Sequence, residues 1–138
     1  MTATPPPHPI VAAYLDAVET ADLDAMLALF AEGAVVHSPL YGTLPATEFY
    51  PALFADTGSS DLTLLGTMRG TSVDGAALLS FLFHFDWVLP NGTRAPFDVV
   101  DVAEVDDDGL IRSIRIIYDT VTVRPAFEAF RDGGPAPS

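Results

Sequence analysis

Apolar residues follow a helical rhythm in the first part of the chain. Between residues 9 and 22, Ile10, Tyr14 and Val18 recur at every fourth position, which places them on one stripe of an amphipathic helix. This stripe predicts a helix that packs against a core, with Tyr14 facing inward.

Two more helices are predicted before the pattern changes. The spacing of apolar residues indicates a second helix over 23–32, which Gly33 is expected to end. A short strand over 34–42 follows, and then a third helix over 46–58. Pro51 lies inside this last segment, so it must sit in the first turn or bend the helix.

After residue 58 the apolar positions alternate with polar ones, which is the pattern of β-strands. Asn91 and Gly92 form a strong signal for a tight turn between two of them. Helices followed by a meander of antiparallel strands predict an α+β domain, in which three N-terminal helices pack in a strongly curved sheet. The predicted strands cover 61–71, 76–89, 93–105 and 110–123.

The strand over 76–89 carries large side chains on one face. A strongly curved sheet leaves a pocket at its open end, so this face is expected to be core at one end and pocket wall at the other. Its members are Leu79, Phe81, Phe83, Phe85, Trp87 and Leu89.

The strand over 93–105 contains two aspartates that cannot share a face. Asp98 and Asp101 are three residues apart, and side chains alternate along a strand with a period of two. Asp98 lies with Val100, Val102 and Glu104 on the more polar face, so Asp101 is predicted to point into the apolar interior.

Composition excludes several classes of partner. The chain has 138 residues, 49% of them apolar, and a net charge of −13 with six arginines and no lysine. Nucleic acids and anionic membranes need a basic surface, so neither is expected as a partner. Three scattered histidines and no cysteine give no metal-ligand spacing, and no phosphate-binding glycine loop is present. Neither a metal nor another cofactor is therefore expected.

The domain is expected to be single and to span residues 9–131, between disordered tails over 1–8 and 132–138. The N-terminus lacks the basic start and apolar run of a signal peptide, and no segment reads as a membrane span. A cytoplasmic location is therefore the expectation.

Three segments together resemble a known family across nearly the whole chain. They are AYLDAVETADLDAMLALFAEGAVVHSPLYG, then EFY, and above all FDVVDVAEVDDDGLIRSIRIIYDTVTV. In order and spacing they resemble the NTF2-like superfamily, and within it the SnoaL-like and ketosteroid isomerase-like proteins. The resemblance implies a cone-shaped fold and a small hydrophobic substrate, such as a steroid or polyketide.

The resemblance also implies catalytic roles for particular residues. Tyr14 matches the helix-1 tyrosine that donates a hydrogen bond to the substrate carbonyl, and Asp101 matches the buried aspartic acid that donates the second. Tyr50 matches a supporting tyrosine, while a further supporting tyrosine falls on Phe30. The aspartate that serves as catalytic base falls on Ser38, which is the main departure from the family.

The ionisation of Asp101 decides between two mechanisms. A carboxyl group in an apolar pocket loses the hydration of its charged form, so its pKa rises. A neutral Asp101 would form an oxyanion hole with Tyr14, as in the ketosteroid isomerases. An ionised Asp101 could instead act as the base, as an aspartate does in related polyketide cyclases.

A serine hydroxyl does not accept a proton at neutral pH, so Ser38 is no base by itself. His37 is a candidate replacement because its unperturbed pKa suits the task, although strand alternation points it away from Ser38. The resemblance and the aromatic face together give the expected ligand-binding residues, namely Tyr50, Phe54, Phe81, Phe83, Phe85, Trp87, Val99, Ile116 and Tyr118.

Three functions remain open at this point. The first is an isomerase- or cyclase-like enzyme, the second a binding protein with a silent pocket, and the third a dimeric interaction module without a ligand. The apolar excess on the face that the helices leave bare also predicts a homodimer. That face carries Leu82, His84, Val88, Val100 and Val102.

Overall fold

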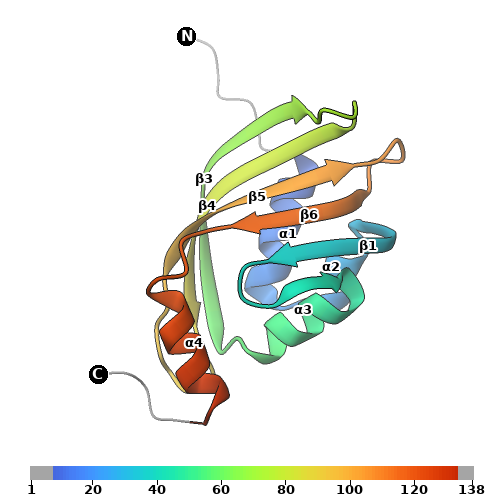
Figure 1. Cartoon of the computed structure of the whole chain (residues 1–138). Coiled ribbons are helices and arrows are strands. Elements are labelled where there is room, and N and C mark those ends of the chain that lie inside the picture. The colour runs from blue at the N-terminus through green and yellow to red at the C-terminus, as the bar shows by residue number, and fades with distance from the viewer. Residues whose placement is uncertain (1–7, 134–138) are drawn as a thin grey trace.

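The structure is a computed structural model of the chain, and it describes residues 8–133. Helices and a single six-stranded sheet make up one α+β unit (Figure 1). The helices are α1 (Pro9–Thr20), α2 (Leu23–Leu27), α3 (Ala46–Ala55) and α4 (Val123–Arg131). The strands are β1 (Phe30–Ser38), β2 (Gly42–Pro45), β3 (Ser59–Thr71), β4 (Ala77–Val88), β5 (Phe97–Val105) and β6 (Ile111–Ile117).

The sheet runs in the order β2-β1-β6-β5-β4-β3. Strands β3 to β6 form the predicted antiparallel meander, and β2 pairs antiparallel with β1. The pairing of β1 with β6 is parallel. This pairing joins the N-terminal part of the chain to the C-terminal part and brings the end of β1 beside the end of β6.

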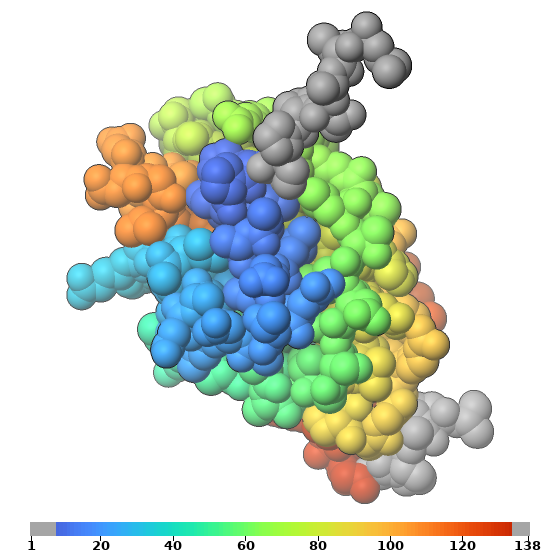
Figure 2. All heavy atoms as spheres, turned by 180° about the vertical axis from the view of Figure 1, so that it is seen from behind, coloured from blue at the N-terminus to red at the C-terminus, as the bar shows by residue number. Residues whose placement is uncertain are grey.

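The sheet curves around the first three helices (Figure 1). Seen from behind, α1 and α2 cover the concave face of the sheet, and β3 runs along their side (Figure 2). The alternation on β4 explains the packing, because Phe81, Phe83, Phe85 and Trp87 are buried while the residues between them are only half-buried. The core therefore lies between the concave face of the sheet and the helices, and it leads towards the pocket.

The second helix is shorter than its sequence predicts. Helix α2 ends at Leu27, and β1 begins at Phe30, so the predicted helix over 23–32 is wrong at its end. The backbone N–H of Ile111 donates to the carbonyl of Leu29, and Phe30 pairs with Ile111. Pairing with a strand 81 residues further along the chain thus overrides the local helical pattern. Gly33, at φ +77°, lies in an irregular part of β1.

The last strand is also shorter than predicted. Strand β6 ends at Ile117, whereas the predicted strand ran to residue 123. Helix α4, over Val123–Arg131, was not predicted. The third helix runs through Pro51, so this proline is neither in the first turn nor at the end. At the chain termini, His8 was assigned to the tail but caps α1 by accepting a hydrogen bond from the Ile10 N–H at 3.1 Å. The predicted tails otherwise fall largely on 1–7 and 134–138, outside the described residues.

None of the helices within residues 8–133 has both the length and the apolar character needed to cross a bilayer.

Candidate active site

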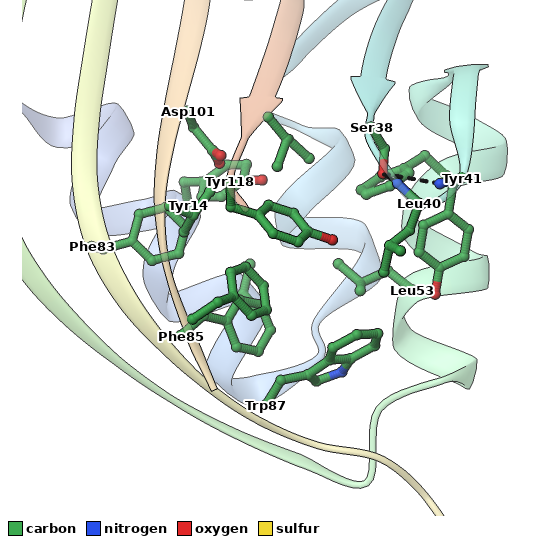
Figure 3. A pocket seen from close by; sticks show the side chains of 15 residues that line it. Tyr14, Ser38, Leu40, Tyr41, Leu53, Phe83, Phe85, Trp87, Asp101 and Tyr118 are labelled. Atoms are coloured by element: carbon green, nitrogen blue, oxygen red, sulfur yellow. Dashed lines mark hydrogen bonds between the residues drawn. The ribbon is translucent and has the colours of Figure 1, made fainter. Parts of the chain in front are cut away.

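A pocket opens between the concave face of the sheet and the turn that follows β1 (Figure 3). Its cavity is about 40 Å³, which is room for roughly three water molecules. The walls are mostly apolar, with a few polar groups. The lining residues are Tyr14, Val18, Ser38, Leu40, Tyr41, Phe49, Leu53, Phe83, Phe85, Trp87, Phe97, Val99, Asp101, Ile116 and Tyr118.

Asp101 faces the interior from β5, as strand alternation predicts. Its register partners are Phe81 on β4 and Ile116 on β6, and only 1% of the residue is exposed. Its Oδ1 atom is buried without a hydrogen-bond partner. Burial raises the pKa of Asp101 to about 8, although the nearby Tyr14 hydroxyl acts in the opposite direction. The carboxyl group is therefore mostly protonated at pH 7.

Tyr14 lies beside Asp101 in the pocket (Figure 3). Helix α1 places it there, and only 3% of the residue is exposed. The Tyr50 hydroxyl, on α3, donates a 2.9 Å hydrogen bond to the Tyr14 hydroxyl. Burial, and next the charge of an ionised Asp101, raise the pKa of Tyr14 well above its ordinary value, so Tyr14 stays a donor.

Ser38 ends β1 and lines the pocket on the side away from Asp101 (Figure 3). Its Oγ accepts the backbone N–H groups of Leu40 at 3.2 Å and Tyr41 at 3.1 Å. A hydroxyl oxygen has two lone pairs, and both are taken by these bonds. Ser38 therefore cannot accept a proton, and its own O–H is left to donate.

His37 lies on the other side of β1 from Ser38. Its Nδ1 shares a 3.0 Å hydrogen bond with the Thr43 hydroxyl on β2, and it does not line the pocket. The structure therefore does not bring His37 to Tyr14 and Asp101, because adjacent residues of a strand point to opposite faces.

The expected ligand-binding residues separate into two groups. Six line the pocket, namely Phe83, Phe85, Trp87, Val99, Ile116 and Tyr118. Tyr50, Phe54 and Phe81 lie behind it. Tyr50 is fully buried, the Phe81 ring meets the Tyr14 ring at 5.3 Å, and the Phe54 ring meets Tyr50 at 6.1 Å. Tyr50 and Phe81 contact Tyr14, Phe54 contacts Tyr50, and none of the three lines the cavity.

Six lining residues were not predicted, namely Val18, Leu40, Tyr41, Phe49, Leu53 and Phe97. Phe97 shares the strand parity of Val99 and Asp101, and its ring stacks on Tyr118 at 4.1 Å. The alternation of side chains along this strand would therefore have predicted Phe97 as a lining residue. Leu40 and Tyr41 belong to the turn after Ser38. The periodicity of the sequence does not predict the path of an irregular turn.

Helix α4 holds this turn in place. The Arg124 guanidinium donates to the carbonyl oxygen of Pro39 at 2.7 Å. Asp56 accepts from the Tyr41 hydroxyl at 2.8 Å and from the Arg131 guanidinium at 3.0 Å. Phe127 of α4 packs against Tyr41 as well. The C-terminal helix thus fixes one wall of the pocket.

The histidine and the aspartate on the outer face of the sheet lie away from the pocket. His84 and Asp98 face outward and form a 2.8 Å pair between Nδ1 and Oδ1. Within residues 8–133, no three side chains of histidine, cysteine, aspartate or glutamate gather as a metal site would require.

Three helices inside a curved sheet, with an apolar pocket that contains a buried acid, define the NTF2-like class of α+β proteins. The family model of the SnoaL-like domain matches residues 11–114. The chain therefore belongs to the SnoaL-like family of NTF2-like domains.

Solved structures share this fold at low sequence identity. Delta 5-3-ketosteroid isomerase from Mycobacterium sp. is 22% identical with a TM-score of 0.64, over 82% of this chain and 92% of that chain. The epoxide hydrolase/cyclase-like enzyme SalBIII, of pyran ring formation in salinomycin, is 21% identical with a TM-score of 0.66, over 82% and 90%. The BvnE pinacolase from Penicillium brevicompactum is 17% identical with a TM-score of 0.66, over 89% and 88%.

Proposed function

We propose that this protein is an enzyme of the isomerase or cyclase type, which acts on a small hydrophobic molecule through an oxygen atom of that molecule. The observation that carries the proposal is the buried pair of Tyr14 and Asp101 in one apolar pocket. Both groups present a donor hydrogen in an apolar pocket, where the pKa of Asp101 is raised to about 8. Such donors stabilise an oxygen on which negative charge develops.

The polar groups of the pocket favour hydrogen-bond donation. At pH 7 the Tyr14 phenol and the Asp101 carboxyl both carry their protons, and Ser38 has used its lone pairs on backbone N–H groups. A substrate oxygen such as a carbonyl or an alkoxide is the complementary partner. The ketosteroid isomerase, the cyclase-like enzyme and the pinacolase of the same fold support a rearrangement or ring closure of an oxygenated molecule.

A second candidate function follows from the nature of Ser38. The family resemblance aligns Ser38 with the catalytic base of the ketosteroid isomerases. General acid–base assistance contributes roughly 10²–10⁴-fold to a rate. A protein that binds a hydrophobic ligand without turnover is therefore the alternative. We further propose that the protein acts in the cytoplasm as a homodimer, with neither nucleic acid nor membrane as a partner.

The size of the cavity limits which probe to use. Pockets for drug-sized ligands measure about 300–1,000 Å³, so a multi-ring substrate requires the walls around the cavity of about 40 Å³ to move apart. A single-ring phenol is the suitable first probe, because its phenolate resembles an enolate and its ionisation is visible by absorbance.

The test is a phenol titration of wild type, Asp101→Asn and Asp101→Leu at pH 7. With a neutral Asp101, the wild type binds the phenolate, and Asp101→Asn keeps most of the binding because an amide still donates. Asp101→Leu weakens binding by about 1–3 kcal/mol, the usual loss for a hydrogen bond to a charged group. If Asp101 is ionised, Asp101→Asn binds the phenolate better than wild type. Equal affinity in all three proteins would show that Asp101 does not touch the ligand.

A turnover assay then distinguishes the two candidate functions, enzyme and binding protein. An enzyme converts an oxygenated polyketide-like or steroid-like substrate, and Tyr14→Phe slows it. A binding protein takes up the same molecule and releases it unchanged.

A further inference from the structure

A second hollow, of about 330 Å³, lies at the ends of β1 and β6 and beside β2. It borders the pocket through a wall formed by Ser38, Ile116 and Tyr118, which line both. Unlike the pocket, it contains the cationic side chain of Arg115 together with His37 and Thr43.

These three side chains form a row across three strands. Thr43 on β2 pairs in register with His37 on β1, and His37 pairs in register with Arg115 on β6. Register partners project from the same face of a sheet. The row is therefore built by the sheet itself, on rigid strands.

The hydrogen bond inside the row fixes the imidazole. The Thr43 hydroxyl and His37 Nδ1 are 3.0 Å apart. When this hydroxyl donates to Nδ1, the hydrogen of a neutral imidazole is on Nε2. His37 then offers an N–H in the same row and the same hollow as Arg115, and Thr43 is a positioning residue.

The charges around the hollow are unusual for this chain. The whole sequence has 19 acidic residues and a net charge of −13, yet no acidic residue lines the hollow. Arg94, Arg112 and Arg131 each pair with a carboxylate, whereas Arg115 forms no ion pair within residues 8–133. A second guanidinium, that of Arg124, is bound to the carbonyl of Pro39 at the rim.

The nearest acidic side chain along the chain forms no ion pair with Arg115 within residues 8–133. Asp119 follows Tyr118, but it does not line the hollow, and its Oδ1 accepts the backbone N–H of Val121 at 3.0 Å. Glu104 lies one strand away from Arg115 and is bound by Arg112.

We propose that this hollow binds an oxyanion, the carboxylate or phosphate group of a small molecule, through Arg115 and His37. A guanidinium and an imidazole N–H both donate to anionic oxygens, and hydrogen bonds to a charged group are stronger than neutral ones. The anion has two possible sources. It is either an acidic group on the molecule that occupies the pocket, since the two cavities share a wall, or a separate anion.

The test of the site uses the ring signals of the three histidines in NMR spectra, at low ionic strength. Inorganic phosphate, and acetate in a parallel titration, are added to the full chain, and the His37 signal is identified by its loss in His37→Gln. The His37 signal shifts and saturates, while the signal of His84, on the outer face beside Asp98, does not. In Arg115→Gln the affinity falls about tenfold or more.

Arg69→Gln is the matched control, because it removes the same charge from an exposed arginine of β3 that does not line the hollow. It leaves the His37 titration unchanged. No shift of His37 in wild type, or an equal loss in the two arginine variants, would overturn the proposal. Because the readout is His37, this result does not depend on the function proposed for the pocket.

A second experiment distinguishes the two sources of the anion. The affinity of a phenol is compared with that of the same phenol extended by a carboxylate chain. If the anion belongs to the pocket ligand, the carboxylate improves binding to wild type and to Arg69→Gln but not to Arg115→Gln. If phosphate titrates His37 and the carboxylate chain brings no gain, the hollow holds a separate anion.

Discussion

The Tyr50 hydroxyl donates a 2.9 Å hydrogen bond to the Tyr14 hydroxyl, so the hydrogen of Tyr14 is directed onward, to Asp101 or to a ligand. Both tyrosines are buried, and Phe81 packs edge-on against the Tyr14 ring. The donor therefore has one orientation set by α3 and the sheet before any ligand arrives. Preorganisation of this kind makes donors effective in a low-dielectric site.

Tyr50→Phe tests this support. The substitution removes the donor to Tyr14 and leaves the ring, so phenolate affinity falls about fivefold, which corresponds to one hydrogen bond of about 1 kcal/mol. The measurement is the absorbance titration of a phenol. In a Tyr14→Phe background the same substitution has no further effect on affinity. Equal effects in both backgrounds would mean that Tyr50 acts on the ligand by another route.

Stability should depend on pH through Asp101. The unfolded carboxyl releases its proton near pH 4, whereas the native pKa is raised to about 8. Between these values the native state holds one more proton, so the free energy of unfolding falls as pH rises, and it levels off above about pH 8. Asp101→Asn lacks this fall.

Urea unfolding at pH 5 and pH 8 measures the effect. The stability of Asp101→Asn relative to wild type rises by roughly 4 kcal/mol between the two pH values, at 1.36 kcal/mol for each unit of pH. Asp74→Asn, in the turn before β4, is the matched control, because its carboxyl is exposed and forms no ion pair within residues 8–133. A difference between Asp101→Asn and wild type that stays constant with pH would contradict a raised pKa.

Ser38→Asp should supply the base that the family resemblance places at this position. The new carboxylate can accept the N–H groups of Leu40 and Tyr41, as the serine does, and it has a second oxygen to take a proton. Isomerisation of a Δ5-3-ketosteroid rises from near background by roughly 10²–10⁴-fold. The measurement is the absorbance of the conjugated product. Ser38→Asn has the same shape without the base and gains nothing.

A folded Ser38→Asp variant that binds a steroid without any gain in rate would contradict the roles of Tyr14 and Asp101. It would show that these donors do not reach the substrate oxygen.

The outer sheet face predicts the oligomeric state. Leu82 and Val100 are register partners on β4 and β5, and both are only half-buried. A second copy would cover this face, so sedimentation should give a homodimer at micromolar concentration. Leu82→Glu is expected to give a folded monomer. Val73→Glu, in the fully exposed turn before β4, should leave the dimer intact, and a wild-type monomer would contradict the prediction.

Sequence periodicity could predict that Asp101 points inward. Side chains alternate along a strand, and Asp98 and Glu104 lie on the more polar of the two faces, so Asp101 lies on the apolar one. Periodicity could not predict that α2 stops at Leu27, because the pairing of Phe30 with Ile111 is a contact between distant parts of the chain. Helix α4 was missed although Val123, Ala126 and Phe127 follow a helical spacing. The β-branched residues before it resemble a continuing strand, and local pattern alone does not decide between the two.

The candidate site also contains features that the sequence could predict and features that it could not. The resemblance and the strand pattern could predict that Tyr14 and Asp101 lie together, since both depend on regular elements. The bonds of Ser38 to Leu40 and Tyr41 depend on the path of an irregular turn. The place of His37 in a row with Arg115 depends on the parallel register of β1 and β6, which no local pattern contains.

The proposed function depends on Asp101 being a protonated donor at neutral pH. The most direct measurement is an NMR titration of the side-chain carboxyl carbons in protein labelled with ¹³C-aspartate, with Asp101 identified by the signal that Asp101→Asn lacks. We predict that this signal titrates with a pKa of about 8 and remains that of a neutral acid at pH 6. A signal that is already that of a carboxylate at pH 5 would contradict it.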